Sequence, residues 1–170
     1  MFNVGEIIVY GTEGVFVVSE HTSSPIDKND DRVFYVLKPV YGSASNVIYT
    51  PANNDRIKMR AVMSREEANS FIERIPSIES LRVECEKKRR VAYREAMADA
   101  DIDDYISIIK SVREKREDCI KNKKRLSESD SDYERRAQFC LYGELSIALE
   151  IGFNEVEGYI SERLSAKEAV

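Results

Sequence analysis

The sequence predicts an α+β protein, with a small β-barrel at the N-terminus followed by an all-α helical bundle. Short runs of β-branched and aromatic residues, separated by turn residues, fill roughly the first sixty positions. After Ser64 the apolar residues recur at helical spacing, and helix-start signals repeat along the chain. This change of pattern predicts two domains, residues 1–62 and residues 63–170.

Five short strands are expected in the N-terminal domain, because apolar runs alternate there with glycine, proline and asparagine turns. The runs lie at residues 4–10, 15–18, 33–37, 46–50 and 57–62. Gly11 and Gly14 bracket the first turn, and Pro51 should end the fourth strand. Strands this short, with no helix between them, are typical of an SH3-like or Tudor-like barrel.

Helices are expected throughout the second domain. Ser64 and Glu67 have the spacing of a capping box, and the helix they begin should end before Pro76. Further helices should run from residues 77–80 to Ala98, from Asp101, from Ser127 to a stop at Gly152, and from Asn154. Repeated start signals with short connections favour an antiparallel bundle.

The sequence contains few candidate residues for catalysis or metal binding. His21 is the only histidine, and we expect it in a solvated loop. The cysteines Cys85, Cys119 and Cys140 are odd in number and far apart, which favours free thiols in a reducing compartment. We therefore expect a cytoplasmic protein that is not an enzyme and has no cofactor, metal or small-molecule substrate. No secretory signal or membrane-spanning run is recognisable, so no membrane partner is expected either.

Charge is distributed unevenly along the chain. The formal net charge is −5, but residues 61–126 carry +2 and residues 127–170 carry −6. Nucleic acid would repel the chain as a whole, so any contact with phosphate must come from a local patch in the middle segment.

Basic residues concentrate in two segments of that middle region. The first consists of Lys87, Lys88, Arg89 and Arg90, and the second of Lys121, Lys123, Lys124 and Arg125. Consecutive helical residues point to different sides, so one run cannot place all its cations on one face. A solvated helix face with ion pairs to Glu84, Glu86 and Glu95 is therefore one interpretation. Contact with phosphate groups is the other.

Several short motifs occur in a fixed order along nearly the whole chain. In the β domain they are FNVGEIIVY at 2–10, GV at 14–15, FYVLK at 34–38 and YTP at 49–51. In the helical domain they are KRLS at 124–127, YERRA at 133–137 and GELS at 143–146. In this order and spacing they resemble the CarD/CdnL family of bacterial transcription regulators. Their N-terminal module also occurs in transcription-repair coupling factors, whose motor motifs this chain lacks.

The resemblance implies that the β domain binds the β subunit of RNA polymerase by pairing a strand edge with it. Main-chain hydrogen bonds would then supply affinity, and flanking side chains would select the partner. The corresponding edge here includes Val47, Ile48 and Tyr49.

The resemblance also implies that the helical domain lies on promoter DNA at the upstream edge of the melted region. Family members contact the backbone there with basic residues and wedge a tryptophan into the minor groove. This chain has no tryptophan, and Glu86 occupies the corresponding position. Tyr93 is the nearest aromatic residue and is expected in the core. The DNA-contacting residues that we expect are Lys87, Lys88, Arg89, Arg90, Lys124 and Arg125.

Two functional hypotheses follow. In the first, the chain is a transcription regulator that joins RNA polymerase to promoter DNA and modulates open-complex stability. In the second, it is a protein–protein adaptor without a DNA role, because its C-terminal third is acidic and the wedge is absent. Salt-sensitive affinity for DNA separates the two hypotheses.

Overall fold

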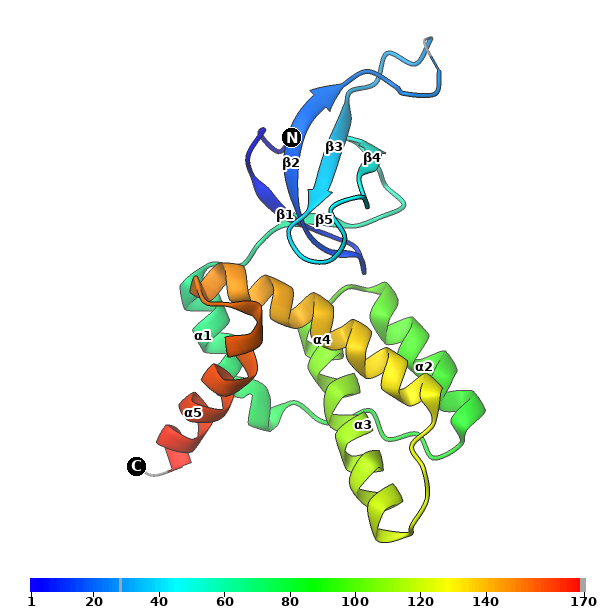
Figure 1. The fold of residues 1–170 in the computed structure, drawn as a ribbon, viewed down its shortest axis with the longest axis vertical. Coiled ribbons are helices and arrows are strands. Elements are labelled where there is room, and N and C mark those ends of the chain that lie inside the picture. Colours follow the sequence, from blue (N-terminus) through cyan, green and yellow to red (C-terminus); the bar gives the residue numbers. More distant parts are fainter. Residues whose placement is uncertain (28, 169–170) are drawn as a thin grey trace. The chain divides into compact units, whose positions relative to one another are not determined.

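The computed structural model describes residues 1–27 and 29–168. The protein is α+β, with an antiparallel sheet followed by helices (Figure 1). It divides into two compact units, Met1–Val62 and Met63–Val170, which we call the β unit and the helical unit.

The β unit is one antiparallel sheet of five strands. The strands are β1 (Ile7–Tyr10), β2 (Gly14–Thr22), β3 (Phe34–Pro39), β4 (Ile48–Pro51) and β5 (Met59–Ala61). Their order across the sheet is β4-β3-β2-β1-β5. Strands β4 and β5 are therefore at the edges of the sheet.

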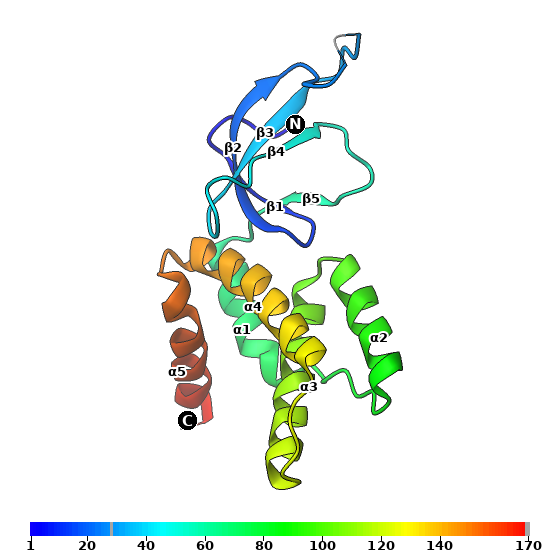
Figure 2. The same cartoon turned by 45° about the vertical axis from the view of Figure 1, so that its right-hand side comes forward.

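The sheet is not closed, which differs from the barrel expected from the sequence. Within the described residues, β4 and β5 do not pair, and residues 52–58 connect one edge to the other (Figure 2). Ala52 and Ile57 of this connection pack against the core, and the Gly11 N–H donates to the Lys58 carbonyl at 2.8 Å. In a closed barrel β4 and β5 would pair with each other, whereas here residues 52–58 lie between them.

An apolar cluster forms the core of the β unit. Its buried members are Ile8, Tyr10, Phe16, Val18, Tyr35 and Leu37. The Tyr10 hydroxyl donates to Thr50 Oγ1 at 3.3 Å, so side chains of β1 and β4 meet across this interior. The core therefore holds β4 in place without strand pairing on its outer side.

Strand β2 is longer than its apolar run predicts. It continues through a bulge between Val18 and Glu20 and pairs with β3 as far as Thr22. His21 therefore lies in a strand rather than in a loop, and its Nε2 is 2.9 Å from the Phe2 carbonyl oxygen. Cross-strand pairing overrides the polar local sequence here.

The helical unit contains five α-helices and two short 3₁₀ turns within the described residues. They are α1 (Arg65–Arg74), η1 (Ile75–Ser77), α2 (Glu86–Ala98), α3 (Ile102–Lys121), α4 (Glu128–Leu149), η2 (Phe153–Glu155) and α5 (Val156–Glu168). The expected capping box is present, because Ser64 and Glu67 bond reciprocally at the start of α1. In both overviews α4 crosses over α3, and the antiparallel bundle expected from the sequence is not confirmed (Figures 1 and 2).

Two helix ends differ from the sequence-based expectation. Helix α2 begins at Glu86 rather than near Ser80, because the preceding chain is bound to α3: Ser111 Oγ donates to the Leu81 carbonyl at 2.7 Å. Helix α4 ends at Leu149, where Glu150 adopts a left-handed conformation with φ of 57°. Gly152 lies beyond that stop and precedes η2. No helix in the described ranges combines the length and apolarity that crossing a membrane requires.

Candidate interaction surfaces

Strand β4 has one side chain that points away from the core. Ile48 packs against the apolar cluster and Thr50 is buried, whereas Tyr49 between them is 53% exposed. This alternation is that of a strand with one face on the core. Of the three residues expected at the edge, Tyr49 is therefore the accessible side chain of the strand.

The main chain of Tyr49 also faces outward. The Ala52 N–H donates to the Val33 carbonyl at 2.8 Å, so these two opposite residues form a hydrogen-bonded pair. Hydrogen-bonded and non-hydrogen-bonded pairs alternate along an antiparallel ladder. Tyr49 and Val36, three pairs further along, are therefore a non-hydrogen-bonded pair. Consistently, the Val36 carbonyl points towards β2, where it accepts from Ser19 Oγ. In such a pair the N–H and C=O of Tyr49 point away from β3, towards the open edge.

Flanking residues limit this open edge to a short segment. The Val47 N–H donates to the Ser45 carbonyl at 2.9 Å, and Pro51 has no N–H. Within β4, only Tyr49 therefore offers an outward donor. The edge can accept a partner strand over a few residues but not a long ladder.

Helix α2 has one buried side and a broad basic side. Arg89, Tyr93 and Met97 are buried at intervals of four residues. The exposed cations Lys87, Lys88, Arg90 and Arg94 make up what we call the α2 basic face. Lys87, Arg90 and Arg94 lie at helical spacing that brings their side chains to one side.

Most arginines of the helical unit have a charged or aromatic partner. Eight of the twelve form ion pairs. Arg136 lies over the Tyr133 ring, 5.7 Å from its centroid. Among the described residues, the three left with neither kind of partner are Arg90, Arg94 and Arg125. Arg90 and Arg125 belong to the two basic segments, and Arg94 lies one turn beyond Arg90 on α2. In the described part of the chain, no ion pair joins either basic segment to Glu84, Glu86 or Glu95, so the interpretation as a face of paired charges is not supported.

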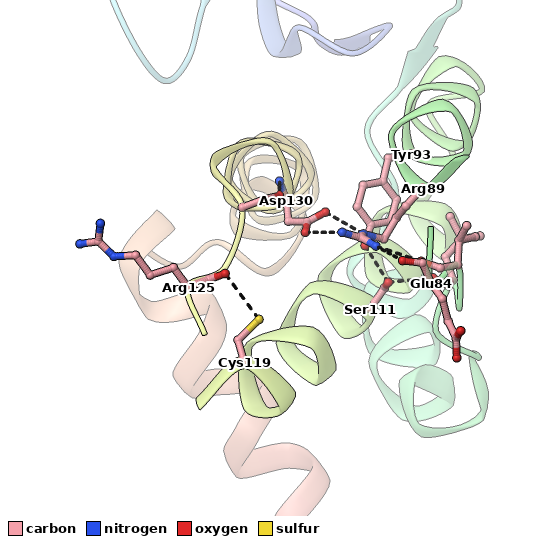
Figure 3. Close-up of polar contacts among 10 residues, drawn as sticks. Glu84, Arg89, Tyr93, Ser111, Cys119, Arg125 and Asp130 are labelled. Carbon is pink, nitrogen blue, oxygen red and sulfur yellow. Dashed lines mark hydrogen bonds and ion pairs between the residues drawn. The ribbon is translucent and has the colours of Figure 1, made fainter. Parts of the chain in front are cut away.

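Arg89 has a structural position, unlike the other cations of its run. It is 4% exposed and binds Asp130 at the start of α4, with Nε–Oδ1 and Nη2–Oδ2 distances of 2.8 and 2.7 Å (Figure 3). Its Nη1 donates to the carbonyls of Val83 and Glu84. Arg89 therefore cannot reach a phosphate, so its predicted role as a DNA-contacting residue is wrong. Its position four residues before Tyr93 and eight before Met97 was the signal in the sequence.

The buried pair shifts the proton equilibria of both partners. Burial alone would raise the pKa of Asp130, but hydrogen bonds from Arg89 and Ser127 outweigh it and hold that pKa below its ordinary value of 3.8. The hydrogen bond to Asp130 raises the pKa of Arg89 above its ordinary value. Both groups are therefore charged at neutral pH, and the pair joins the first turns of α2 and α4.

The second basic segment lies in the turn between α3 and α4. Lys121, Lys123, Lys124 and Arg125, which we call the basic turn, are all exposed. Figure 3 shows the Arg125 side chain extending away from the Arg89–Asp130 pair, on the other side of Asp130 from α2. Arg125 therefore does not converge with Arg89, and the two basic segments provide separate surfaces.

No aromatic side chain of α2 is available at the surface. Tyr93 is fully buried, as expected, and its hydroxyl is 2.7 Å from Ser111 Oγ. Glu86, at the position corresponding to the family's tryptophan, is exposed. The exposed side of α2 thus offers charge and aliphatic carbon but no ring for stacking.

Two grooves of the helical unit were not anticipated from the sequence. One, of about 320 Å³, lies between α4, η2 and α5 and is lined by Phe139, Tyr142 and Phe153 with polar residues around them. The other, of about 580 Å³, is polar and lies beside Arg89 and Ser111. Both depend on contacts between distant segments, so no local sequence pattern indicates them.

Thiol and metal chemistry adds no further site in the described parts of the chain. Cys85 is exposed and Cys119 and Cys140 are buried, all as free thiols. Histidine, cysteine and carboxylate side chains do not cluster into a metal site there. Comparison with known proteins makes no assignment, because no protein-family model and no curated protein matches the chain. Inference about function therefore rests on the β4 edge and the basic surfaces.

Proposed function

We propose that this protein is a bacterial transcription regulator of the CarD/CdnL type. It docks on the β subunit of RNA polymerase through the outer edge of β4. Its α2 basic face contacts promoter DNA phosphates near the melted region and modulates open-complex stability. The observation that carries this proposal is that, among the described residues, Arg90 and Arg94 have neither an ion-pair nor an aromatic partner, whereas the other arginines of the helical unit are mostly paired.

Electrostatics supports a phosphate-rich partner for the α2 basic face. Lys87 and Arg90 are three residues apart, and Arg90 and Arg94 are four apart. Like charges at these spacings destabilise a helix by about 0.2–0.5 kcal/mol per pair. Binding to phosphates relieves this repulsion and releases counterions from the DNA. Because these contacts read no base, we expect this surface to position the protein without selecting sequence.

The β unit supports the docking half of the proposal. We infer that it is a Tudor-like module in which residues 52–58 replace continuous strand pairing between β4 and β5. The outward N–H and C=O of Tyr49 provide the two main-chain groups that a partner strand would bind. Lys38 is exposed on β3 and lies next to β4 in the sheet, so it favours a partner segment with a carboxylate nearby.

Docking is tested with the full chain and the isolated β-subunit lobe of bacterial RNA polymerase. Tyr49→Asp adds a charge at the edge and should reduce capture at least tenfold, whereas Tyr49→Phe should retain it. Substituting Ile48 is less suitable, because Ile48 packs against the core and its loss would disturb the fold. If Tyr49→Asp captures the lobe as well as the native chain does, the lobe binds a surface other than the β4 edge. If the native chain does not capture the lobe, docking is refuted.

DNA contact is tested by the salt dependence of affinity for a promoter duplex. Arg94→Ala should flatten the slope of log affinity against log salt by about 0.9 for the lost phosphate contact. Arg135→Ala is the matched control, because it removes the same charge from an arginine already paired with Asp132. Equal slopes for both variants would contradict the assignment of the α2 basic face.

A protein–protein adaptor without DNA binding is the second candidate. The groove of about 320 Å³ with its three aromatic side chains favours it, together with the net charge of −6 over residues 127–170. Such a groove suits an apolar side chain of a partner better than a phosphate. This candidate would be supported if the chain does not bind DNA even at low salt but still captures the polymerase lobe.

A further inference from the structure

The basic turn carries an exposed apolar side chain next to its cations. Ile120, immediately before Lys121, is 70% exposed. In the described part of the helical unit, Ile120 and Val91 are the two large hydrophobic residues that are exposed. Ile120 directly precedes the second basic segment, and Val91 directly follows the first. An isolated exposed isoleucine needs no explanation, but this coincidence with unpaired cations points to a ligand with anionic and apolar parts.

Hydrogen bonds hold the basic turn in one conformation. The Asn122 N–H donates to the Asp118 carbonyl at 3.0 Å, and the Lys124 N–H donates to the Cys119 carbonyl at 2.8 Å. Lys123 has a φ of 54°, the left-handed conformation that often ends a helix. Cys119 Sγ lies 3.7 Å from the Arg125 carbonyl oxygen (Figure 3). The cations therefore project from a fixed turn rather than from a loose loop.

The basic turn also protrudes. In Figures 1 and 2 the C-terminal end of α3 extends beyond the ends of the neighbouring helices of its unit. A narrow turn of this shape can enter a groove, whereas the long side of α2 can only lie along a surface. The two basic surfaces thus differ in shape as well as in position.

We propose that the basic turn enters the minor groove of duplex DNA and places Ile120 against a base step. Lys121, Lys123 and Lys124 would hold the phosphates that border the groove. This inference rests on the proposed function and adds to it a second contact, separate from the α2 basic face. Apolar side chains of this kind insert at flexible steps and widen the groove, with flanking cations on the backbone.

An anionic lipid surface fits the basic turn less well. Interfacial binding needs an apolar stripe along a helix, and its strength scales with the apolar area that is buried. Here a single aliphatic side chain accompanies four cations. Duplex DNA needs only one such side chain at one step, so DNA is the occupant that the turn favours.

The test uses the full chain and a short duplex with one TA step, in which 2-aminopurine replaces the adenine. Fluorescence of the probe should rise on binding, because the step becomes partly unstacked. Ile120→Ala should abolish that rise and lower affinity roughly tenfold, with an unchanged salt slope. Lys124→Ala should instead flatten the salt slope by about 0.9. Ile26→Ala is the matched control, because Ile26 is 95% exposed outside both basic segments.

Each outcome separates this inference from the proposed function. If the native chain binds DNA with salt sensitivity but Ile120→Ala retains affinity and fluorescence, the inference fails and the α2 assignment stands. If no salt-sensitive binding occurs at all, both fail. If Ile120→Ala instead weakens binding to vesicles of phosphatidylglycerol and phosphatidylcholine without affecting DNA, the turn is a lipid contact and the inference is overturned. Equal melting curves for the variants would show that the fold is intact.

Discussion

A run of four cations can serve two purposes because each residue faces a different part of the molecule. Arg89 belongs to the buried side of α2, whereas Lys87, Lys88 and Arg90 face solvent. The buried guanidinium is compensated by Asp130 and two carbonyls. Removing one partner of a buried pair leaves an uncompensated charge, which costs far more than losing an exposed pair. Arg89 is thus a residue for stability and not for DNA contact.

Asp130→Asn tests this role. It keeps the shape of the side chain but removes the charge opposite Arg89, so we expect the free energy of unfolding to fall by about 3 kcal/mol. Urea denaturation measures the change. Asp132→Asn, in the exposed pair with Arg135, should cost less than about 1 kcal/mol. A loss of similar size in both variants would mean that burial of the Arg89–Asp130 pair does not set its contribution.

The same carboxylate makes stability depend on pH. Because the pKa of Asp130 is lowered in the folded protein, its contribution to stability is complete above its ordinary value of 3.8. That contribution is lost as the pH falls through the lower folded value. We therefore expect the difference in unfolding free energy between the native chain and Asp130→Asn to be constant from about pH 5 to 7 and to shrink below about pH 4. A difference that grows on acidification would contradict the assignment.

At the scale of elements, α2 differs from its neighbours in how its first turn is capped. Ser64, Asp101 and Ser127 each cap a helix with a side-chain oxygen, whereas Cys85 before α2 makes no such bond. The backbone of Cys85 is already extended, with φ of −68° and ψ of 117°, as an N-cap requires. The position of α2 therefore depends on its packing and on the Arg89–Asp130 pair more than on its own cap.

Cys85→Ser should stabilise the protein for this reason. A serine oxygen at this position can accept from an N–H of the first turn, which contributes about 1 kcal/mol. Chemical denaturation of the reduced protein measures the gain. Ser64→Ala, which removes an existing capping box from α1, should produce a loss of similar size. No gain in Cys85→Ser would indicate that water or a neighbouring group already satisfies the first turn of α2.

Local signals predicted the elements better than their limits. The caps at Ser64 and Ser127 are readable because their hydrogen bonds close within three residues. The late start of α2 was not readable, because Ser111 holds Leu81 from 30 residues away. For the candidate site, the basic runs were evident, but the open edge at Tyr49 depends on which strands pair. The separation of the two basic surfaces likewise depends on the packing of α2, α3 and α4.

At the scale of the whole molecule, the proposed function needs two binding surfaces on one chain. The β4 edge lies in the β unit, and the α2 basic face lies in the helical unit. Once one surface is bound, the other acts at an effective concentration that the connection sets. Modest contacts on each unit can therefore suffice together on a polymerase–promoter complex, although neither is expected to be strong alone.

A variant of either surface should therefore lose binding to one partner and keep binding to the other. Variants of both kinds should lose the effect on promoter complexes. Tyr49→Asp should lose the polymerase lobe while retaining affinity for free DNA. The double variant Arg90→Ala with Arg94→Ala should retain the lobe and lose salt-sensitive DNA binding. Either should remove the effect of the native chain on the lifetime of promoter complexes, measured by competitor challenge. An effect that persists in Tyr49→Asp would show that DNA contact acts without docking, because a linked mechanism requires both surfaces at once.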